Sequence, residues 1–161
     1  MNEDVINKLP AYWWVDTASG KSIVHMAITF GLLENVYDQF FSKWGLSKTK
    51  ANVLLLLYKN QSMALWELGE DMLVTRANIT GLMDRLERSG LVTREVNSSD
   101  RRSLTAKLTL KGKKIVDEII PLLKEFTEEV MSSLAEDEKR VLIKLLQKVQ
   151  QIKNKFKVGE K

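Results

Sequence analysis

Residues 73–90 read LVTRANITGLMDRLERSG, the pattern of one helix with two unlike faces. Thr75 is the predicted N-cap of this helix, and Gly90 is predicted to end it. The apolar side chains recur at three- and four-residue steps, which places them on one buried face: Ile79, Leu82, Met83 and Leu86. The other side chains form an exposed, polar front of fairly small residues: Arg76, Ala77, Asn78, Thr80, Gly81, Asp84 and Arg88.

A shorter helix is predicted just upstream, at residues 65–73. Two helices joined by a tight turn match the helix-turn-helix layout, whose second helix enters the major groove of DNA by its N-terminal end. Arg76, Asn78 and Thr80 lie near that end and off the buried face. Their donors are therefore placed to reach base edges or phosphates, although an ordinary solvated surface would carry the same residue types.

After Gly90 the period of the apolar residues changes from about 3.6 to 2. Residues 91–96 and 104–110 alternate apolar and polar, which predicts a two-stranded hairpin with its tip at 97–103, NSSDRRS. A lone hairpin is marginal in water, so this one must pack on the neighbouring helices. The tip is either a solvated loop or a wing beside the helix, where arginine favours the negative potential of a narrow minor groove.

Most of the remaining chain is predicted to be helical. Helices are expected at residues 22–44, 48–59, about 110–132 and about 136–157. Gly45 is expected to stop the first of these, and Ser47 to cap the second. Thr109 is the expected cap of the third, which Pro121 is expected to kink. Residues 60–63, NQSM, are predicted to form a loop.

Positive charge is concentrated in the middle of the chain. The chain as a whole carries a formal net charge of +4, whereas residues 75–113 hold nine Lys and Arg against four Asp and Glu. A basic centre on a nearly neutral body indicates a localised anionic partner, and the alternative is a solvated face with chance clustering. Arg85 and Arg88 are expected either to contact phosphates or to pair with acidic neighbours on the helix. Those neighbours are Asp84 and Glu87.

Composition excludes several kinds of site. The chain has no cysteine, which excludes disulfides, a thiol-based sensor and any Cys-ligated metal. The only histidine, His25, has no evident partners for a metal, so no cofactor is expected. Residues 19–22, SGKS, lack the upstream glycine of a phosphate loop and are interpreted as a helix start. No basic-then-apolar leader opens the sequence, so no signal peptide is expected, and the longest aliphatic run, residues 53–58, is too short to cross a bilayer. A cytoplasmic protein without a membrane partner is therefore expected.

The last predicted helix carries one apolar face, formed by Val141, Leu142, Leu145, Leu146, Val149, Ile152 and Phe156. This face belongs either to an intramolecular core or to a contact with a second copy across a two-fold axis, and the second interpretation is favoured. Residues 10–16, PAYWWVD, are rich in aromatic side chains. They are interpreted as packing in a dimer, with a ligand pocket or simple packing of an N-terminal arm as the alternatives.

Three motifs follow one another in the central part of the chain: LMDRLERSGLVTR at 82–94, DRRS at 100–103 and LTLKG at 108–112. In this order they resemble the MarR family of winged-helix transcription regulators, and the resemblance covers about 46–112. It implies a mostly α fold with a small β-hairpin wing. It also implies a homodimer that binds palindromic double-stranded operator DNA, most often as a repressor released by a small ligand, here a small aromatic or lipophilic effector.

The resemblance also assigns parts of the chain. Residues 1–161 become one domain, with a winged-helix DNA-binding lobe at 47–111 and a helical dimerisation region at 1–46 and 112–161. The candidate DNA-binding residues are Thr75, Arg76, Ala77, Asn78, Thr80, Gly81, Arg85, Ser99, Asp100, Arg101 and Arg102.

In the family, one wing arginine enters the minor groove and the aspartate braces an arginine. The sequence leaves open which of Arg101 and Arg102 does which. The usual Asp-Pro-like entry to the wing is replaced here by Asn97-Ser98-Ser99. Further phosphate contacts are expected from Lys107, Lys111 and Lys113.

Two other classes of function remain as alternatives. A winged-helix module that binds protein rather than DNA would predict a less basic wing. An enzyme would need a nucleophile with its base, a metal cluster or a glycine-rich loop, and the sequence offers none of these.

Overall fold

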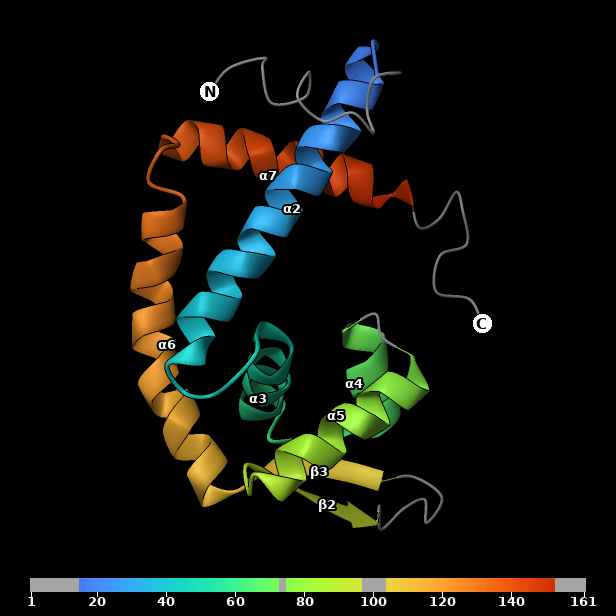
Figure 1. The fold of residues 1–161 in the computed structure, drawn as a ribbon, viewed down its shortest axis with the longest axis vertical. Coiled ribbons are helices and arrows are strands. Elements are labelled where there is room, and N and C mark those ends of the chain that lie inside the picture. The colour runs from blue at the N-terminus through green and yellow to red at the C-terminus, as the bar shows by residue number, and fades with distance from the viewer. Residues whose placement is uncertain (1–14, 73–74, 97–103, 153–161) are drawn as a thin grey trace. The chain divides into compact units, whose positions relative to one another are not determined.

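The computed structural model describes residues 15–72, 75–96 and 104–152, and it is mostly helical with one small sheet (Figure 1). The chain divides into two compact units, with the boundary after Ala51. Predictions that fall on 10–14, on the tip 97–103 or on the basic C-terminal residues 153–161 lie outside the described residues.

In the first unit the main element is α2 (Ala18–Ser42). It begins four residues earlier than predicted, because the Thr17 hydroxyl accepts a hydrogen bond from the Gly20 N–H at 3.0 Å and so caps the helix there. The interpretation of SGKS as a helix start is thereby confirmed. The helix ends where Gly45 adopts a φ of +66°, as predicted.

The second unit holds most of the elements. After α3 (Lys48–Asn60), within which the unit boundary falls, come β1 (Ser62–Ala64), α4 (Leu65–Asp71), α5 (Arg76–Arg88), β2 (Val92–Val96), β3 (Leu104–Leu108), α6 (Leu110–Val130) and α7 (Glu136–Gln150). The helix α6 runs unbroken through Pro121, and Thr109 is its N-cap, as predicted.

The sheet corrects one prediction. Residues Ser62 and Met63, predicted to lie in the loop 60–63, form β1 together with Ala64, and the strands follow the order β1-β3-β2 in antiparallel pairs. Met63 lies opposite Ala106, and both side chains are buried. A three-residue strand is too short to show alternation, and it exists here because β3 supplies its hydrogen-bond partners. The predicted two-stranded hairpin is therefore part of a three-stranded sheet.

The predicted buried face of α5 is confirmed. Ile79, Leu82, Met83 and Leu86 are all buried, and α5 packs against α4 and β2 (Figure 1). Burying side chains of this size stabilises the fold by about 1.5–3 kcal/mol each. This stripe holds α5 in place, and its opposite face is left at the surface.

The end of α5 is closed by a glycine turn. Gly90 has a φ of +68°, a conformation that glycine adopts without steric cost. Its N–H donates to the Glu87 carbonyl oxygen at 2.8 Å, and the Leu91 N–H donates to the Leu86 carbonyl oxygen at 3.1 Å. This pair of bonds is a Schellman motif, and it turns the chain back into β2.

The same turn is bound to the start of α6. The Thr109 hydroxyl donates to the Gly90 carbonyl oxygen at 2.7 Å, and the Thr109 N–H donates to that of Leu91 at 3.0 Å. Lys111 Nζ donates to the carbonyl oxygen of Ser89 at 3.0 Å. The successive carbonyl oxygens of Ser89, Gly90 and Leu91, just after α5, thus accept hydrogen bonds from Thr109 and Lys111. We call this contact the α5–α6 joint.

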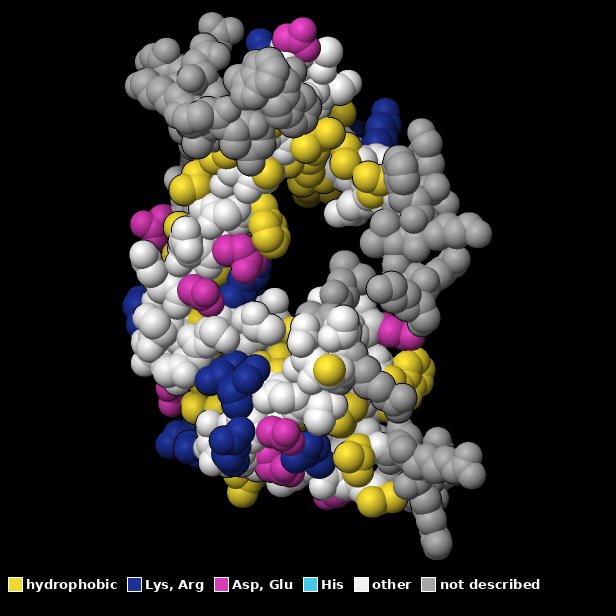
Figure 2. Space-filling view, turned by 45° about the vertical axis from the view of Figure 1, so that its right-hand side comes forward, with side chains coloured by type: hydrophobic (Ala, Val, Ile, Leu, Met, Phe, Trp, Pro, Cys, Tyr) yellow, Lys and Arg dark blue, Asp and Glu magenta, His cyan; other side chains and the backbone are white. Residues whose placement is uncertain are grey.

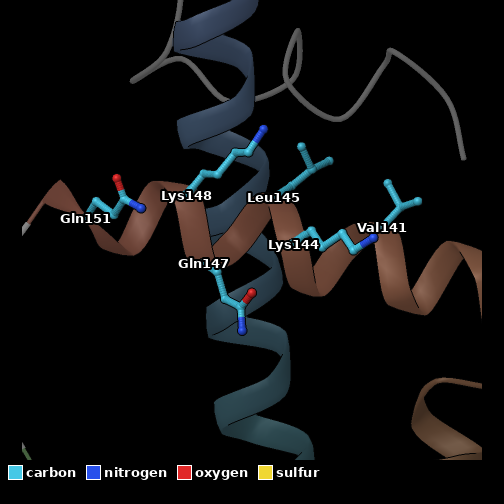
Figure 3. Close-up of a pocket in the computed structure, with 6 residues that line it drawn as sticks. All are labelled: Val141, Lys144, Leu145, Gln147, Lys148 and Gln151. Carbon is cyan, nitrogen blue, oxygen red and sulfur yellow. The ribbon is translucent and has the colours of Figure 1, made fainter.

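Among the described residues, none of those in α7 is buried. Its apolar side chains lie at the surface, and Leu145 keeps 55% of its accessible area. In Figure 3, Val141 and Leu145 point to the same side of α7, whereas Gln147 points to another. A shallow hollow of the structure lies along this helix, lined by Val141, Lys144, Leu145, Gln147, Lys148 and Gln151.

Candidate nucleic-acid interface

The exposed face of α5 carries the predicted recognition residues. Ala77, Asn78, Thr80 and Arg85 are exposed, and Gly81 is half-buried. Arg76 is the first residue of the helix, and its position is described by its backbone alone. The structure therefore gathers these positions on one outward face, in the order that the helical period predicts.

Thr75 has a structural task as well as its predicted one. Its hydroxyl oxygen accepts a hydrogen bond from the Asn78 N–H at 3.4 Å and caps α5, as expected. The bond uses the backbone of Asn78 and leaves the carboxamide of that residue outside the cap. Asn78 is therefore an exposed side chain held at a fixed place in the first turn.

The predicted wing residues Ser99, Asp100, Arg101 and Arg102 lie outside the described residues. The strands that lead to them are described: Val96 at the end of β2 lies opposite Leu104 at the start of β3. The two ends of the 97–103 segment are therefore brought together beside each other at one end of the sheet.

An ionic cluster that the sequence did not reveal joins α5 to β2. Arg94 lies 2.7 Å from Asp84, measured from Nη1 to Oδ1, and its Nε donates to Glu87 Oε2 at 3.0 Å. Its Nη2 donates to the same Glu87 oxygen, and its backbone N–H donates to Glu87 Oε1 at 3.2 Å. One guanidinium thus binds two carboxylates of the helix, and we call this group the Arg94 cluster.

Hydrogen bonds explain the titration of this cluster. The side-chain hydrogen bonds from Arg94 lower the pKa of Glu87. The reciprocal hydrogen bond to Glu87 raises the pKa of Arg94. Both groups are therefore charged at neutral pH, and the cluster is a true ion pair.

The Arg94 cluster bears on one of the two expectations for Arg85 and Arg88, their pairing with Asp84 and Glu87. The ion pairs of the described residues that include Asp84 or Glu87 are made with Arg94. Pairing of the two helix arginines with these acidic neighbours was therefore wrong. Arg88 instead donates from Nε to the Asp84 carbonyl oxygen at 3.2 Å, one turn earlier on the same helix.

Each lysine expected to contact phosphate has a partner within the chain. Lys107 lies 2.6 Å from Glu95, and Lys113 lies 3.2 Å from Asp117, whereas Lys111 is part of the α5–α6 joint. Figure 2 shows such mixing of Lys and Arg with Asp and Glu over the lower part of the view. Exposed pairs contribute only about 0–1 kcal/mol, so a phosphate competes readily for these ammonium groups.

Tyr58 connects α3 to the start of α6. Its hydroxyl donates to Asp117 Oδ1 at 2.6 Å, and this hydrogen bond raises the pKa of Tyr58. The same bond, followed by the one from Lys113, lowers the pKa of Asp117. These contacts hold α3 beside the first part of α6 within the second unit.

No group of three or more His, Cys, Asp or Glu side chains that could hold a metal ion occurs among the described residues. None of the described helices is long and apolar enough to span a membrane.

Comparisons with known proteins agree with this arrangement of helices and strands. The model of the MarR family matches residues 46–104. The repressor YetL of Bacillus subtilis, described as an HTH-type transcriptional repressor, is 33% identical over 116 residues, which are 71% of this chain and 70% of YetL. The uncharacterized HTH-type transcriptional regulator YkoM of the same organism is 38% identical over 104 residues, 65% of this chain and 68% of YkoM.

Solved structures agree with these sequence matches. A mutant MarR from E. coli, in a crystal structure with operator DNA, has a TM-score of 0.73 and 25% identity and covers 82% of this chain and 94% of its own. A MarR protein from Peptoclostridium difficile has a TM-score of 0.80 at 22% identity, over 90% of this chain and 96% of its own, and shows the same fold. The chain therefore belongs to the MarR family of winged-helix transcriptional regulators, a family that is not enzymatic.

Proposed function

We propose that this regulator is a homodimer that binds a palindromic DNA operator and represses transcription until a small ligand releases it. The observation that carries the proposal is the exposed face of α5, a helix held from behind by four buried side chains. The likeness to a MarR mutant solved with operator DNA supports it. Such a helix presents side chains to the major groove without changing its own fold.

The proposed major-groove contacts are Thr75, Arg76, Ala77, Asn78, Thr80, Gly81 and Arg85. Among them Asn78 has the carboxamide that pairs with adenine, and the small Ala77 suits the thymine methyl group. The proposed wing contacts are Ser99, Asp100, Arg101 and Arg102, with one arginine in the minor groove.

The proposed assignment of the chain to two regions follows from the apolar side chains that stay exposed. Residues 47–111 form the DNA-binding lobe, and 1–46 with 112–161 form the dimerisation region. The unburied apolar face of α7 supports this division, because a second copy would cover it (Figure 3). A two-fold dimer places its recognition helices about 34–36 Å apart, one turn of DNA, which is why the operator is proposed to be palindromic.

Repression and release are the finer parts of the proposal. The name of YetL, a transcriptional repressor, supports repression rather than activation. A small aromatic or lipophilic effector would act by changing the separation of the two recognition helices, since the pitch of DNA is fixed. The protein would do this in the cytoplasm, where bacterial operator DNA lies.

Selection of bound sequences from a random pool of DNA duplexes tests the proposal. The expected result is one inverted repeat with half-sites about ten base pairs apart, bound with an affinity that falls by roughly a thousandfold between 50 and 200 mM salt. Replacing Arg101 and Arg102 by alanine is expected to weaken that binding strongly and to leave the dimer intact.

The two alternative outcomes have different meanings. A protein that enriches no sequence, and whose DNA binding does not respond to salt, would be the protein-binding module instead. Operator binding that survives in the Arg101→Ala, Arg102→Ala variant would remove the wing from the interface while leaving the role of α5 in place.

Gly81 offers a test of the α5 surface in which stability and binding change in opposite directions. A Cβ added at Gly81 would meet no heavy atom within 4 Å, so neither packing nor backbone conformation requires glycine there. Glycine inside a helix costs about 1 kcal/mol relative to alanine. Gly81→Ala is therefore expected to raise the free energy of unfolding by up to about 1 kcal/mol. It should also weaken operator binding about tenfold, because the DNA occupies the space of the methyl group.

A matched control exists in α2. Gly31 also lies inside a helix with nothing within 4 Å of an added Cβ. Gly31→Ala is expected to give a similar gain in stability without loss of operator binding. The measurements are thermal unfolding and fluorescence anisotropy of a labelled operator. Unchanged binding by Gly81→Ala would place Gly81 outside the interface.

A further inference from the structure

The acidic residues of α5 raise a question about DNA binding. Asp84 and Glu87 lie on the helix that is proposed to enter the major groove, and their carboxylates would repel phosphates if they were left without a counter-charge. Two arginines on the same helix, Arg85 and Arg88, stand next to them in sequence. If these arginines neutralised the acidic residues, they would be withdrawn from the DNA.

The structure assigns the counter-charge to a residue of another element, whose single positive charge offsets half of the two negative ones. Arg94 belongs to β2, and its guanidinium contacts both carboxylates of α5. Its fork geometry suits this task, since a guanidinium presents several fixed donors where an ammonium presents a point charge. Only 21% of the Arg94 side chain is exposed, so it is enclosed between helix and strand and is poorly placed to contact DNA itself.

The two arginines of α5, Arg85 and Arg88, do not share these carboxylates. Among the described residues, no ion pair includes Arg85 or Arg88, and both side chains are exposed. Arg88 is held only through its Nε, by the backbone carbonyl of Asp84. The guanidinium groups of Arg85 and Arg88 are therefore not paired with the carboxylates of Asp84 and Glu87.

From this geometry we infer that Arg94 is a positioning residue for DNA binding. It is the internal counter-ion of α5: it binds the carboxylates of Asp84 and Glu87, so that Arg85 and Arg88 remain available to contact phosphates. The inference rests on the proposed function, because it assigns a role within the same DNA interface. It adds a residue of β2 that acts through other residues and does not contact the operator.

Removal of the counter-ion is the first test. Arg94→Gln leaves two carboxylates on α5 without their partner, and roughly a tenfold loss of operator affinity is expected at 50 mM salt. The loss should shrink at 300 mM salt, since the Debye length there falls well below 10 Å. Arg94→Lys keeps the positive charge and is expected to retain most of the affinity.

A triple variant separates charge from structure. Arg94→Gln combined with Asp84→Asn and Glu87→Gln removes the cation together with both anions. The variant carries one more net positive charge than the wild type. If Arg94 acts as a counter-ion, it therefore regains an affinity at least equal to that of the wild type, although the bridge between helix and strand is gone. A purely structural bridge would leave it as weak as Arg94→Gln.

Lys139 provides the matched control. Its side chain is 20% exposed, and its ammonium is shared by Glu128 and Glu136, so Lys139→Gln also strips one cation from two carboxylates. Its carboxylates lie on α6 and α7, outside the proposed DNA surface, so no loss of operator affinity is expected for a variant that light scattering shows to be dimeric. Thermal unfolding and light scattering of every variant verify the fold and the dimer.

The results that overturn the inference are distinct from those that overturn the proposed function. A wild-type protein that selects no operator contradicts the proposed function. A wild type that binds its operator, with Arg94→Gln equally tight or with the triple variant no tighter than Arg94→Gln, contradicts only the counter-ion. Should Arg94→Gln fail to fold, the comparison of Arg94→Lys and the triple variant with the wild type decides, because weak binding by both contradicts the inference.

Discussion

Gly112→Ala is expected to lower the free energy of unfolding by about 3 kcal/mol, at the upper end of the range for overpacking. A Cβ added at Gly112 would lie 2.1 Å from the Leu91 carbonyl oxygen, far inside van der Waals contact. That oxygen is backbone, and it is also held by the Thr109 N–H at 3.0 Å, so it cannot move aside without breaking the α5–α6 joint. The glycine that follows Leu-Thr-Leu-Lys is thus required by space, and its backbone φ is not in the left-handed region.

Thermal unfolding at a fixed protein concentration measures this effect. A loss of 3 kcal/mol corresponds to a fall in Tm of roughly 6–12 °C for a chain of this size. Gly31→Ala is again the control, since it adds the same methyl group in open space. A Gly112→Ala protein as stable as the wild type would show that the first turn of α6 can withdraw from the end of α5.

Leu145→Glu is expected to convert the proposed dimer to monomers at micromolar concentration. The side chain is 55% exposed in the single chain and lies on the apolar face of α7, which the proposed second copy would cover. A two-fold interface contains every residue twice, so two leucines, at about 2 kcal/mol each, would be lost together with the cost of burying two carboxylates. The dimer is therefore expected to weaken by roughly a thousandfold or more.

The control for this variant lies on the same helix. Gln147→Glu introduces the same charge on the side of α7 that points away from Leu145 (Figure 3), and it should leave the dimer intact. Analytical ultracentrifugation gives the oligomeric state, and anisotropy gives the operator affinity, which falls with the dimer. Dimers that persist in Leu145→Glu would place the dimer contact elsewhere.

The elements that could be predicted from the sequence are those set by local chemistry. Thr75 and Gly90 mark the ends of α5 by capping and by a left-handed turn, both of which depend on a few neighbouring residues. Its buried face follows from the spacing of four apolar residues. The same period predicts which candidate DNA contacts face outward, and those of α5 that the structure describes do so.

What the sequence did not reveal depends on contacts between elements. The strand β1 exists only because β3 lies beside it, and it is too short to show alternation, so its first two residues were assigned to a loop. Arg94 counted only as one positive charge in a basic segment, because its carboxylates become its partners when the turn at Gly90 folds β2 back along α5. The roles of the wing residues 99–102 remain predictions from the family resemblance.

The α5–α6 joint has a mechanical consequence. Three carbonyls in a row leave no slack between the two helices, so a rotation of one is passed to the other. The helix α6 has 21 residues and is about 30 Å long, so its far end lies well away from the joint with α5, the proposed recognition helix. A sideways shift of about 2 Å at its far end tilts it by on the order of 4°. A ligand or partner that displaced that remote end would therefore be expected to turn α5 without touching it.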